Sequence, residues 1–155
     1  MGVWNINDKT LFNSLINVNT NEIYNKRHLV PFGEYIPFSS SLRGLIDFFD
    51  MPMSNVAHGS SIQDNMQISS LDGVSFSPLI CFDVAFGNTV RKSNISSNFM
   101  INVSNDTWFG KSMGPHQHLA ITRIRAIENN KWIIRATNDG ISAIITNNGT
   151  IVDKI

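Results

Sequence analysis

Short apolar segments that alternate with one helical pattern constrain the fold of this chain most. Residues 78–81 (PLIC) and 99–103 (FMINV) have the length of buried strands, and the second is followed by the polar residues 104–106. Residues 115–130 begin with a proline, which suits a first helical turn. They carry an apolar stripe at helical spacing, formed by Leu119, Ile121, Ile124 and Ile127. Strands and helices in this order predict an α/β fold with a mixed sheet.

Hairpin signals lie on both sides of this central region. The Asn-Asn-Gly turn at 147–149 predicts an antiparallel pair formed by residues 141–146 and 150–153. Further strands are expected at 2–5, 11–18, 66–68, 74–76 and 132–136. The polar residues 5–8 are the expected turn between the first two of these strands.

The segment between the early strands and the central region is interrupted by prolines. Residues 28–38 (HLVPFGEYIPF) cannot form a continuous helix, because Pro31 and Pro37 interrupt it, so we expect an ordered loop. Residues 41–49 (SLRGLIDFF) are a candidate amphipathic helix. The many apolar side chains from 38 to 51 leave two alternatives open, a core helix or a mobile lid that faces a membrane.

Composition excludes several classes of function. Twelve basic residues balance twelve acidic ones, and no run of one sign indicates a nucleic-acid partner. The chain has one cysteine, so it forms no internal disulfide and no multi-cysteine zinc site. His116 and His118 are two residues apart, a spacing that points the two rings to different sides of a helix, so the pair is not a convincing set of metal ligands. No stretch approaches the roughly 18 apolar residues of a membrane span.

A few residues carry the types of side chain that chemistry needs. Cys81 ends a strand before an acidic residue, so it is either a small buried apolar residue or an exposed thiolate nucleophile. Lys26 is either a solvated charge or, in a desolvated site, a cation for the negative oxygen of a tetrahedral intermediate. Glu34 is the nearest plausible partner of that ammonium, and Asp83 suits a first helical turn. Position and type alone do not choose between these alternatives.

Residues 24–37 (YNKRHLVPFGEYIP) closely resemble the Y-x-K-x-H-L-V-P-F-G-E-Y/F-V-P segment of the apolipoprotein N-acyltransferases. These are bacterial inner-membrane enzymes with a nitrilase-like catalytic domain. The resemblance continues in order through nearly the whole chain, at 50–54 (DMPMS), 80–83 (ICFD), 104–112 (SNDTWFGKS), 114–118 (GPHQH), 123–128 (RIRAIE) and 135–143 (RATNDGISA). It implies that residues 1–155 form the carboxy-terminal portion of one nitrilase-like α-β-β-α sandwich.

The resemblance also implies roles for individual residues. It identifies Cys81 as the catalytic nucleophile, Lys26 as the catalytic lysine and Glu34 as a second, supporting glutamate. Supporting or substrate-binding positions are implied at Phe82, Asp83, Asn105, Asp106 and Trp108. Family members usually carry Cys-Tyr-Glu where this chain has Cys81, Phe82 and Asp83. The change keeps an aromatic ring and an acid, but it removes a hydroxyl and shortens the arm of the carboxylate.

The implied reaction moves a fatty acyl chain in two steps through a cysteine thioester. The acyl donor is a phospholipid, the acceptor is the amino-terminal diacylglyceryl-cysteine of a lipoprotein, and no cofactor or metal takes part. The implied location is the bacterial inner membrane, with the catalytic domain facing the periplasm. The general-base glutamate and the membrane helices of the family have no counterpart in these residues. We therefore expect a partial domain, inactive by itself.

Two other functions remain open at this point. A soluble nitrilase-like amidase would use the same glutamate, lysine and cysteine, with water as the acceptor in place of the lipoprotein amine. The segment 28–38 and the apolar residues after it favour the acyltransferase. A chain without its general base could also be a non-catalytic fragment.

Overall fold

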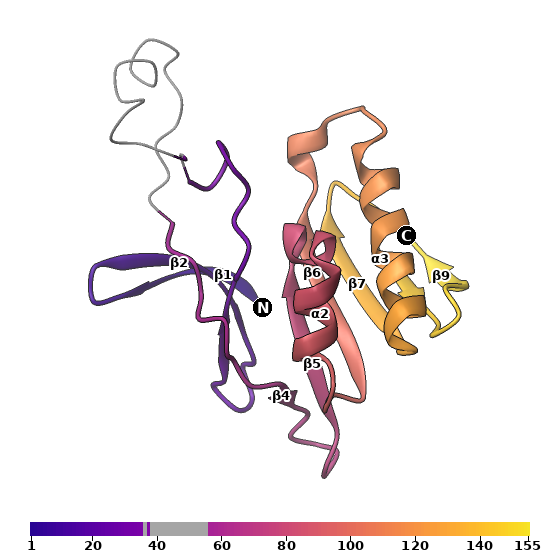
Figure 1. The fold of residues 1–155 in the computed structure, drawn as a ribbon, viewed down its shortest axis with the longest axis horizontal. Helices are drawn as coiled ribbons and strands as arrows, with labels where there is room; N and C mark the ends of the chain where they lie inside the picture. Colours follow the sequence, from indigo (N-terminus) through magenta and orange to yellow (C-terminus); the bar gives the residue numbers. More distant parts are fainter. Residues whose placement is uncertain (36, 38–55) are drawn as a thin grey trace.

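The computed structural model describes residues 1–35, 37 and 56–155, which form two β-sheets and the helices that pack on one of them (Figure 1). The smaller sheet is antiparallel, with the order β1-β2-β3. Its strands are β1 (Gly2–Asn7), β2 (Thr10–Ile16) and β3 (Ile23–Asn25). The expected helix at 41–49 and the whole apolar segment 38–51 lie outside the described residues.

The first hairpin turns two residues later than the sequence predicts. Asn5 pairs with Phe12, and Asn7 pairs with Thr10, so residues 5–7 belong to β1 and not to the turn. The turn itself consists of Asp8 and Lys9, whose φ angles are 46° and 67°. Two residues with positive φ match the right-handed twist of the flanking strands, which explains why the hairpin closes here.

The larger sheet has the strand order β4-β5-β6-β7-β8-β9. Its three central strands, β5 to β7, are parallel, and the outer strands are antiparallel to their neighbours. The sheet is therefore mixed, as the sequence predicts. Its strands are β4 (Met66–Gln67), β5 (Ser75–Ile80), β6 (Phe99–Asn105), β7 (Ile133–Asn138), β8 (Ala143–Ile145) and β9 (Ile151–Lys154).

Helices follow the carboxyl ends of the parallel strands. They are η1 (Cys81–Ala85), α2 (Gly87–Ser93), η2 (Thr107–Phe109) and α3 (Gly114–Asn129). Helices α2 and α3 lie on the same face of the larger sheet (Figure 1). Their apolar side chains join those of the sheet in one core, in which Val90, Met100 and Ile133 are fully buried. Burial of side chains of this size contributes about 1.5–3 kcal/mol each.

The buried face of α3 differs from the predicted apolar stripe. Leu119 is buried, but Ile124 and Ile127 remain 46% and 53% exposed. The face that packs on the sheet carries small and polar residues instead, namely Pro115, His118, Thr122 and Ala126. The prediction is confirmed for Leu119 and Ile121, which contact the core, and wrong for Ile124 and Ile127. Apolar residues were assumed to mark the buried side, whereas α3 also covers a buried polar network.

A second core joins the two sheets. Leu15 and Tyr24 of the smaller sheet pack with Met66, Phe76 and Ile80 of the larger one. The described residues thus form three layers, with helices, the larger sheet and the smaller sheet in that order, which corresponds to α-β-β of the predicted α-β-β-α sandwich. Residues 1–35, 37 and 56–155 contain no helix on the outer side of the smaller sheet.

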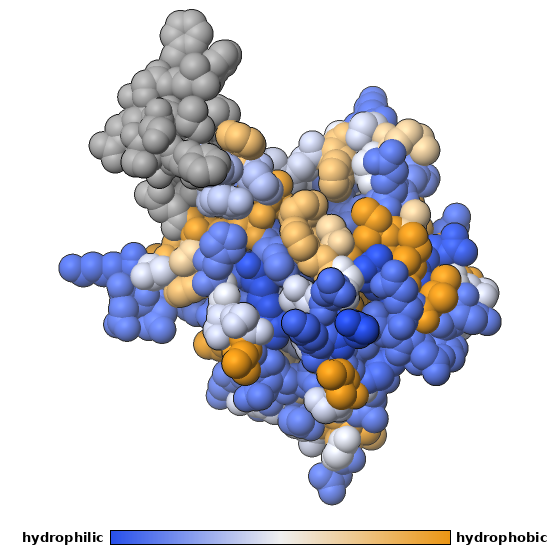
Figure 2. Space-filling view, in the orientation of Figure 1, coloured by the Kyte–Doolittle hydropathy of each residue, from blue (hydrophilic) through white to orange (hydrophobic). Residues whose placement is uncertain are grey.

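The surface in view in Figure 2 is mostly hydrophilic, with apolar residues in small separate patches. Within the described part of the chain, no helix combines the length and the hydropathy that a membrane span needs.

Candidate active site

Cys81 lies at the sharp turn between strand β5 and the helical turn η1. All six residues of β5 are buried, and the chain leaves the sheet at Cys81 with a φ of 47°. This left-handed conformation is uncommon for a residue with a side chain, and observed strain of this kind often marks a functional position. Cys81 is a half-buried free thiol.

Lys26 follows β3 and is almost fully buried, with 1% of its surface exposed. Its ammonium Nζ lies 2.6 Å from Oε2 of Glu34. The same carboxylate accepts hydrogen bonds from the backbone N–H of Val30 at 2.8 Å and from the side-chain amide of Asn13 at 2.7 Å. A buried ammonium needs a countercharge and hydrogen-bond partners of this kind. The predicted pairing of Lys26 with Glu34 is present.

One cavity of about 550 Å³ brings these residues together between the ends of the two sheets. Lys26 and Glu34 line it from the segment after β3, and Cys81 lines it from the end of β5. Its remaining lining combines apolar and polar side chains, among them Val3, Trp4, Val30, Ile80, Val103, Ser104, Asn105, Trp108 and Ala136. A volume of this order suits a small molecule or part of an acyl chain.

Asp83 connects the segment that carries Lys26 to the turn that carries Cys81. It is 1% exposed and accepts hydrogen bonds from the hydroxyl of Tyr24 at 2.9 Å, the backbone N–H of His28 at 2.9 Å and the backbone N–H of Ile80 at 3.0 Å. Tyr24 and His28 flank Lys26, and Ile80 precedes Cys81. The carboxylate therefore holds the lysine and the cysteine in a defined relation.

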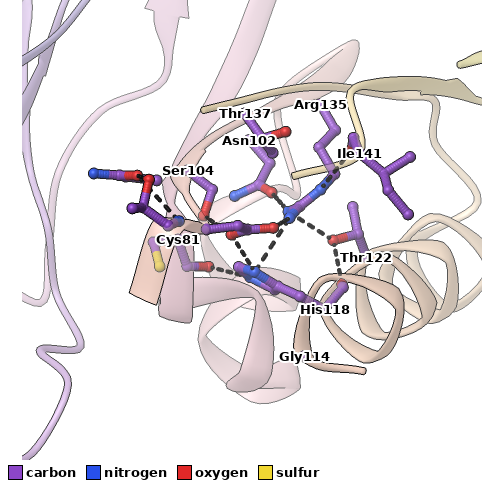
Figure 3. Close-up of polar contacts among 12 residues, drawn as sticks. Cys81, Asn102, Ser104, Gly114, His118, Thr122, Arg135, Thr137 and Ile141 are labelled. Atoms are coloured by element: carbon purple, nitrogen blue, oxygen red, sulfur yellow. Dashed lines mark hydrogen bonds and ion pairs between the residues drawn. The ribbon is translucent and has the colours of Figure 1, made fainter. Parts of the chain in front are cut away.

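Beside Cys81 lies a second buried polar network, in which His118, Thr122 and Arg135 are connected (Figure 3). Asp106 is fully buried and accepts hydrogen bonds from Ser104 at 2.6 Å, from His118 Nδ1 at 2.9 Å and from Arg135 Nη2 at 2.7 Å. Burial raises the pKa of Asp106, but the bonds from His118 and Ser104 and the charge of Arg135 outweigh it, so the pKa lies below its usual value. The carboxyl group is therefore ionised at neutral pH.

Three residues of this region have the side-chain types of a metal site, but the charges around them do not suit a cation. One ligand atom each of Cys81, Asp106 and His118 lies within 4.8 Å of the others. The guanidinium of Arg135 already neutralises Asp106 and lies 3.1 Å from His118 Nδ1. A cation bound here would lie against another cation, so these residues do not fit a metal.

The sequence pattern of the carbon-nitrogen hydrolases matches residues 1–155, the whole of the chain. The chain belongs to the carbon-nitrogen hydrolase family. The three-layer arrangement described above is the matching portion of the α/β sandwich of this family, and the fold predicted from the sequence is confirmed.

Curated relatives of this carbon-nitrogen hydrolase chain are named apolipoprotein N-acyltransferases. The protein from Photobacterium profundum is 44% identical over 133 residues, and that from Pseudomonas syringae pv. tomato is 46% identical over 132 residues. Each match covers 85% of this chain but only 25% and 26% of the relative. The chain thus spans about a quarter of the length of these relatives.

Solved carbon-nitrogen hydrolases share the fold at low sequence identity. A superfamily protein from Xanthomonas campestris, with an arsenic adduct in its active site, is 20% identical, with a TM-score of 0.67 over 99% of this chain and 56% of that one. A mutant amidase from Nesterenkonia is 18% identical, with a TM-score of 0.61 over 94% of this chain and 51% of that one. The amidase carries a covalent acetamide adduct on its active-site cysteine.

The residues predicted from the sequence fall into two groups in this carbon-nitrogen hydrolase fold. Five of them line the cavity: Lys26, Glu34, Cys81, Asn105 and Trp108. The other three do not line it: Phe82, Asp83 and Asp106. Asp83 and Asp106 are buried in the two networks on either side of Cys81, and Phe82 packs edge-on against the ring of Phe86.

Two residues of the site were not singled out by the sequence analysis. His118 was set aside with His116 because the pair has no ligand spacing, and Arg135 received no role. Both are buried, at 7% and 2% exposure. His118 and Thr122 are four residues apart, on the helical face that also carries Leu119 and Ala126. That spacing was the available signal for a polar residue on the buried side of α3.

The protonation of Asp83 gives a testable pH dependence. Burial raises the pKa of Asp83 above the ordinary value of 3.8 and outweighs the hydrogen bonds from His28, Ile80 and Tyr24, which lower it, so folding favours the protonated form. The stabilisation from the raised pKa is complete below pH 3.8, the unfolded value, and is lost as the pH rises through the folded value. The difference in free energy of unfolding between wild type and Asp83→Asn should therefore decrease from acidic to neutral pH.

Urea unfolding at several pH values measures this difference, which changes by about 1.4 kcal/mol for each unit by which the pKa is raised. The matched control is Asp72→Asn on an exposed turn, which should stay close to wild type throughout. A difference that grows toward neutral pH would show that the burial of Asp83 does not govern its charge.

Proposed function

We propose that this chain is the nucleophile-bearing part of an apolipoprotein N-acyltransferase. In this proposal a fatty acyl chain moves from a phospholipid to the amino-terminal diacylglyceryl-cysteine of a lipoprotein. The observation that carries the proposal is the cavity shared by Cys81, Lys26 and Glu34, in a chain that is 44–46% identical to proteins of that name. The domain assignment, residues 1–155 as the carboxy-terminal portion of the catalytic domain, belongs to the same proposal.

The first step proposed is attack of the Cys81 sulfur on the ester carbonyl of the phospholipid. The carbonyl oxygen gains the negative charge of a tetrahedral intermediate, and two donors stabilise it, the ammonium of Lys26 and the backbone N–H of Phe82. Donors fixed in a partly desolvated cavity do this at little reorganisation cost. The ester C–O bond then breaks, the lysophospholipid leaves as an alcohol after taking up a proton, and a thioester remains on Cys81.

The second step is the reverse in form. The α-amino group of the diacylglyceryl-cysteine attacks the thioester, the C–S bond breaks, and an amide forms. The proton that the amine loses is taken up by the sulfur of Cys81, which is restored as the thiol. Glu34 has a supporting role, because it keeps the ammonium of Lys26 oriented through the 2.6 Å ion pair. The thiol proton passes to the general-base glutamate of the family, whose position precedes residue 1 in the resemblance.

The lining of the cavity supports a lipid acyl group as the substrate. Val3, Trp4, Val30, Val103 and Ala136 surround the polar groups with apolar surface. An acyl chain gains about 0.8 kcal/mol for each methylene that leaves water, whereas a small amide gains little from such a wall. We place this reaction at the inner membrane of a bacterium, on the periplasmic side, as the resemblance implies.

A chimera tests the proposal against the amidase alternative. This chain would replace the matching 132-residue segment of the Pseudomonas syringae relative. We expect the chimera to transfer a radiolabelled acyl chain from phospholipid to a diacylated lipopeptide, and Cys81→Ala to abolish the transfer. The 155-residue chain alone should show no transfer. Release of ammonia from small amides without acyl transfer would contradict the proposal in favour of an amidase.

A further inference from the structure

The backbone carbonyl of Cys81 has a partner that the proposed reaction does not use. His118 Nε2 lies 3.1 Å from this oxygen, and His118 comes from α3, 37 residues further along the chain. In Figure 3 the carbonyl of Cys81, and not its sulfur, faces the imidazole. The contact therefore acts on the backbone at the position where φ is 47°.

The partners of the two ring nitrogens of His118 show which role the imidazole has. Its Nδ1 faces the carboxylate of Asp106 at 2.9 Å, and its Nε2 faces the carbonyl of Cys81. The carbonyl of Cys81 can only accept, so Nε2 is the donor in this contact and has no lone pair with which to take a proton from the thiol. His118 Nδ1 lies against both the carboxylate of Asp106 and the guanidinium of Arg135. The imidazole acts as a clamp between this buried pair and the backbone of Cys81.

Arg135 holds Asp106 and the imidazole of His118 in place. This side chain is 2% exposed, and in addition to Asp106 it donates to the side chains of Asn102 and Thr122 and to the carbonyl of Ile141. Thr122 in turn donates to the carbonyl of His118 at 2.9 Å. A planar guanidinium with this many partners allows little movement of Asp106 or of the imidazole. Buried polar groups that are all satisfied make such a unit rigid.

We infer that His118 is a positioning residue, which holds Cys81 in its left-handed conformation and so aims the sulfur at the acyl carbonyl in the cavity. The inference rests on the proposed role of Cys81 as the nucleophile. Release of the carbonyl would allow the backbone at Cys81 to relax to a negative φ, and this would displace both the sulfur and the N–H of Phe82 from the carbonyl under attack. Displacement by about 1 Å can cost about 10²-fold in rate.

Two variants of His118 separate positioning from folding. His118→Leu has a similar size but no donor. His118→Gln places an amide N–H where Nε2 lies, and its amide oxygen can accept from Arg135. The matched control is His116→Leu, an exposed residue two positions away on the same helix.

In the chimera, two rates are measured on Cys81 by mass spectrometry: formation of the thioester from phospholipid, and addition of acrylamide. The first needs an aligned sulfur, and the second needs only an accessible thiol. We expect His118→Leu to slow thioester formation about 10²-fold with a much smaller effect on acrylamide addition. His118→Gln should recover most of the loss, and His116→Leu should match wild type. Equal loss of both rates, or no difference between Leu and Gln, would overturn the inference.

A second measurement does not depend on acyl transfer. The intraresidue HN–Hα NOE of Cys81, in the isotope-labelled 155-residue chain, reports the sign of φ, because the two protons lie close together only at a positive φ. Wild type and His118→Gln should show a positive φ, and His118→Leu a negative one. If wild type forms no thioester, the proposed function fails, and an unchanged φ in His118→Leu would still overturn the positioning role by itself.

Discussion

Replacement of Arg135 by methionine should lower the free energy of unfolding by about 3–5 kcal/mol, because it leaves a fully buried carboxylate without its countercharge. Arg135 Nη2 lies 2.7 Å from Asp106, and both side chains are shielded from water. Methionine fills much of the volume but donates no hydrogen bond, so Asn102, Thr122 and the carbonyl of Ile141 also lose a donor. A domain has only about 5–15 kcal/mol of stability in total, so the loss is large.

Urea unfolding of wild type and variant measures this loss. The matched control is Arg91→Met on the exposed side of α2, which should change the stability by less than about 0.5 kcal/mol. The double variant Arg135→Met, Asp106→Asn should be more stable than Arg135→Met alone, because it removes the unpaired charge. Equal stability of the Arg135 and Arg91 variants would show that the Asp106 network does not hold this part of the fold together.

Replacement of Lys26 by methionine should slow acylation of Cys81 by about 10²–10³-fold, the usual cost of removing one oxyanion donor. The ammonium is almost fully buried and lines the cavity that Cys81 also lines, so no water molecule from bulk solvent replaces it easily. The rate is measured as the appearance of acyl-Cys81 in the chimera after acid quenching. Lys111→Met, an exposed lysine in the loop before α3, is the matched control and should leave the rate unchanged.

Loss of Lys26 also leaves Glu34 with a buried charge, so its effect on folding must be separated from its effect on chemistry. Glu34 keeps two donors, Val30 N–H and the amide of Asn13, and Glu34→Gln removes the charge. The double variant Lys26→Met, Glu34→Gln should recover stability in urea without recovering the acylation rate. A double variant that acylates at the wild-type rate would assign Lys26 to folding alone.

The positions of Cys81 and Lys26 followed from local signals in the sequence. A short apolar run that ends at Cys81 predicts a strand end, and the carboxyl ends of parallel strands are where α/β folds place chemistry. Pro31 and Pro37 exclude a helix after Lys26, and Glu34 does lie against the ammonium. The close resemblance of residues 24–37 to the acyltransferase family implied that the lysine segment and the cysteine segment belong to one site. The spacing of the residues in the sequence could not show this.

The buried polar network was not predictable in the same way. His118 and Arg135 are 17 residues apart, on α3 and β7, and they meet only because the helix packs across the sheet. Apolar periodicity assigned the buried face of α3 to Leu119, Ile121, Ile124 and Ile127, and the last two are exposed. Periodicity cannot identify polar side chains that are buried by pairing. The packing of the smaller sheet against β5 likewise depends on contacts between residues far apart in the sequence, such as Leu15 with Phe76 and Ile80.

The most direct test of Cys81 as the nucleophile is to find the acyl group itself. The chimera is mixed with phospholipid without a lipopeptide acceptor, quenched in acid, digested and analysed by mass spectrometry. We expect one peptide, containing Cys81, whose mass is increased by a fatty acyl chain that hydroxylamine removes, and no such adduct in Cys81→Ala. An acyl chain on another residue, or full transfer to lipopeptide by Cys81→Ala, would contradict Cys81 as the nucleophile.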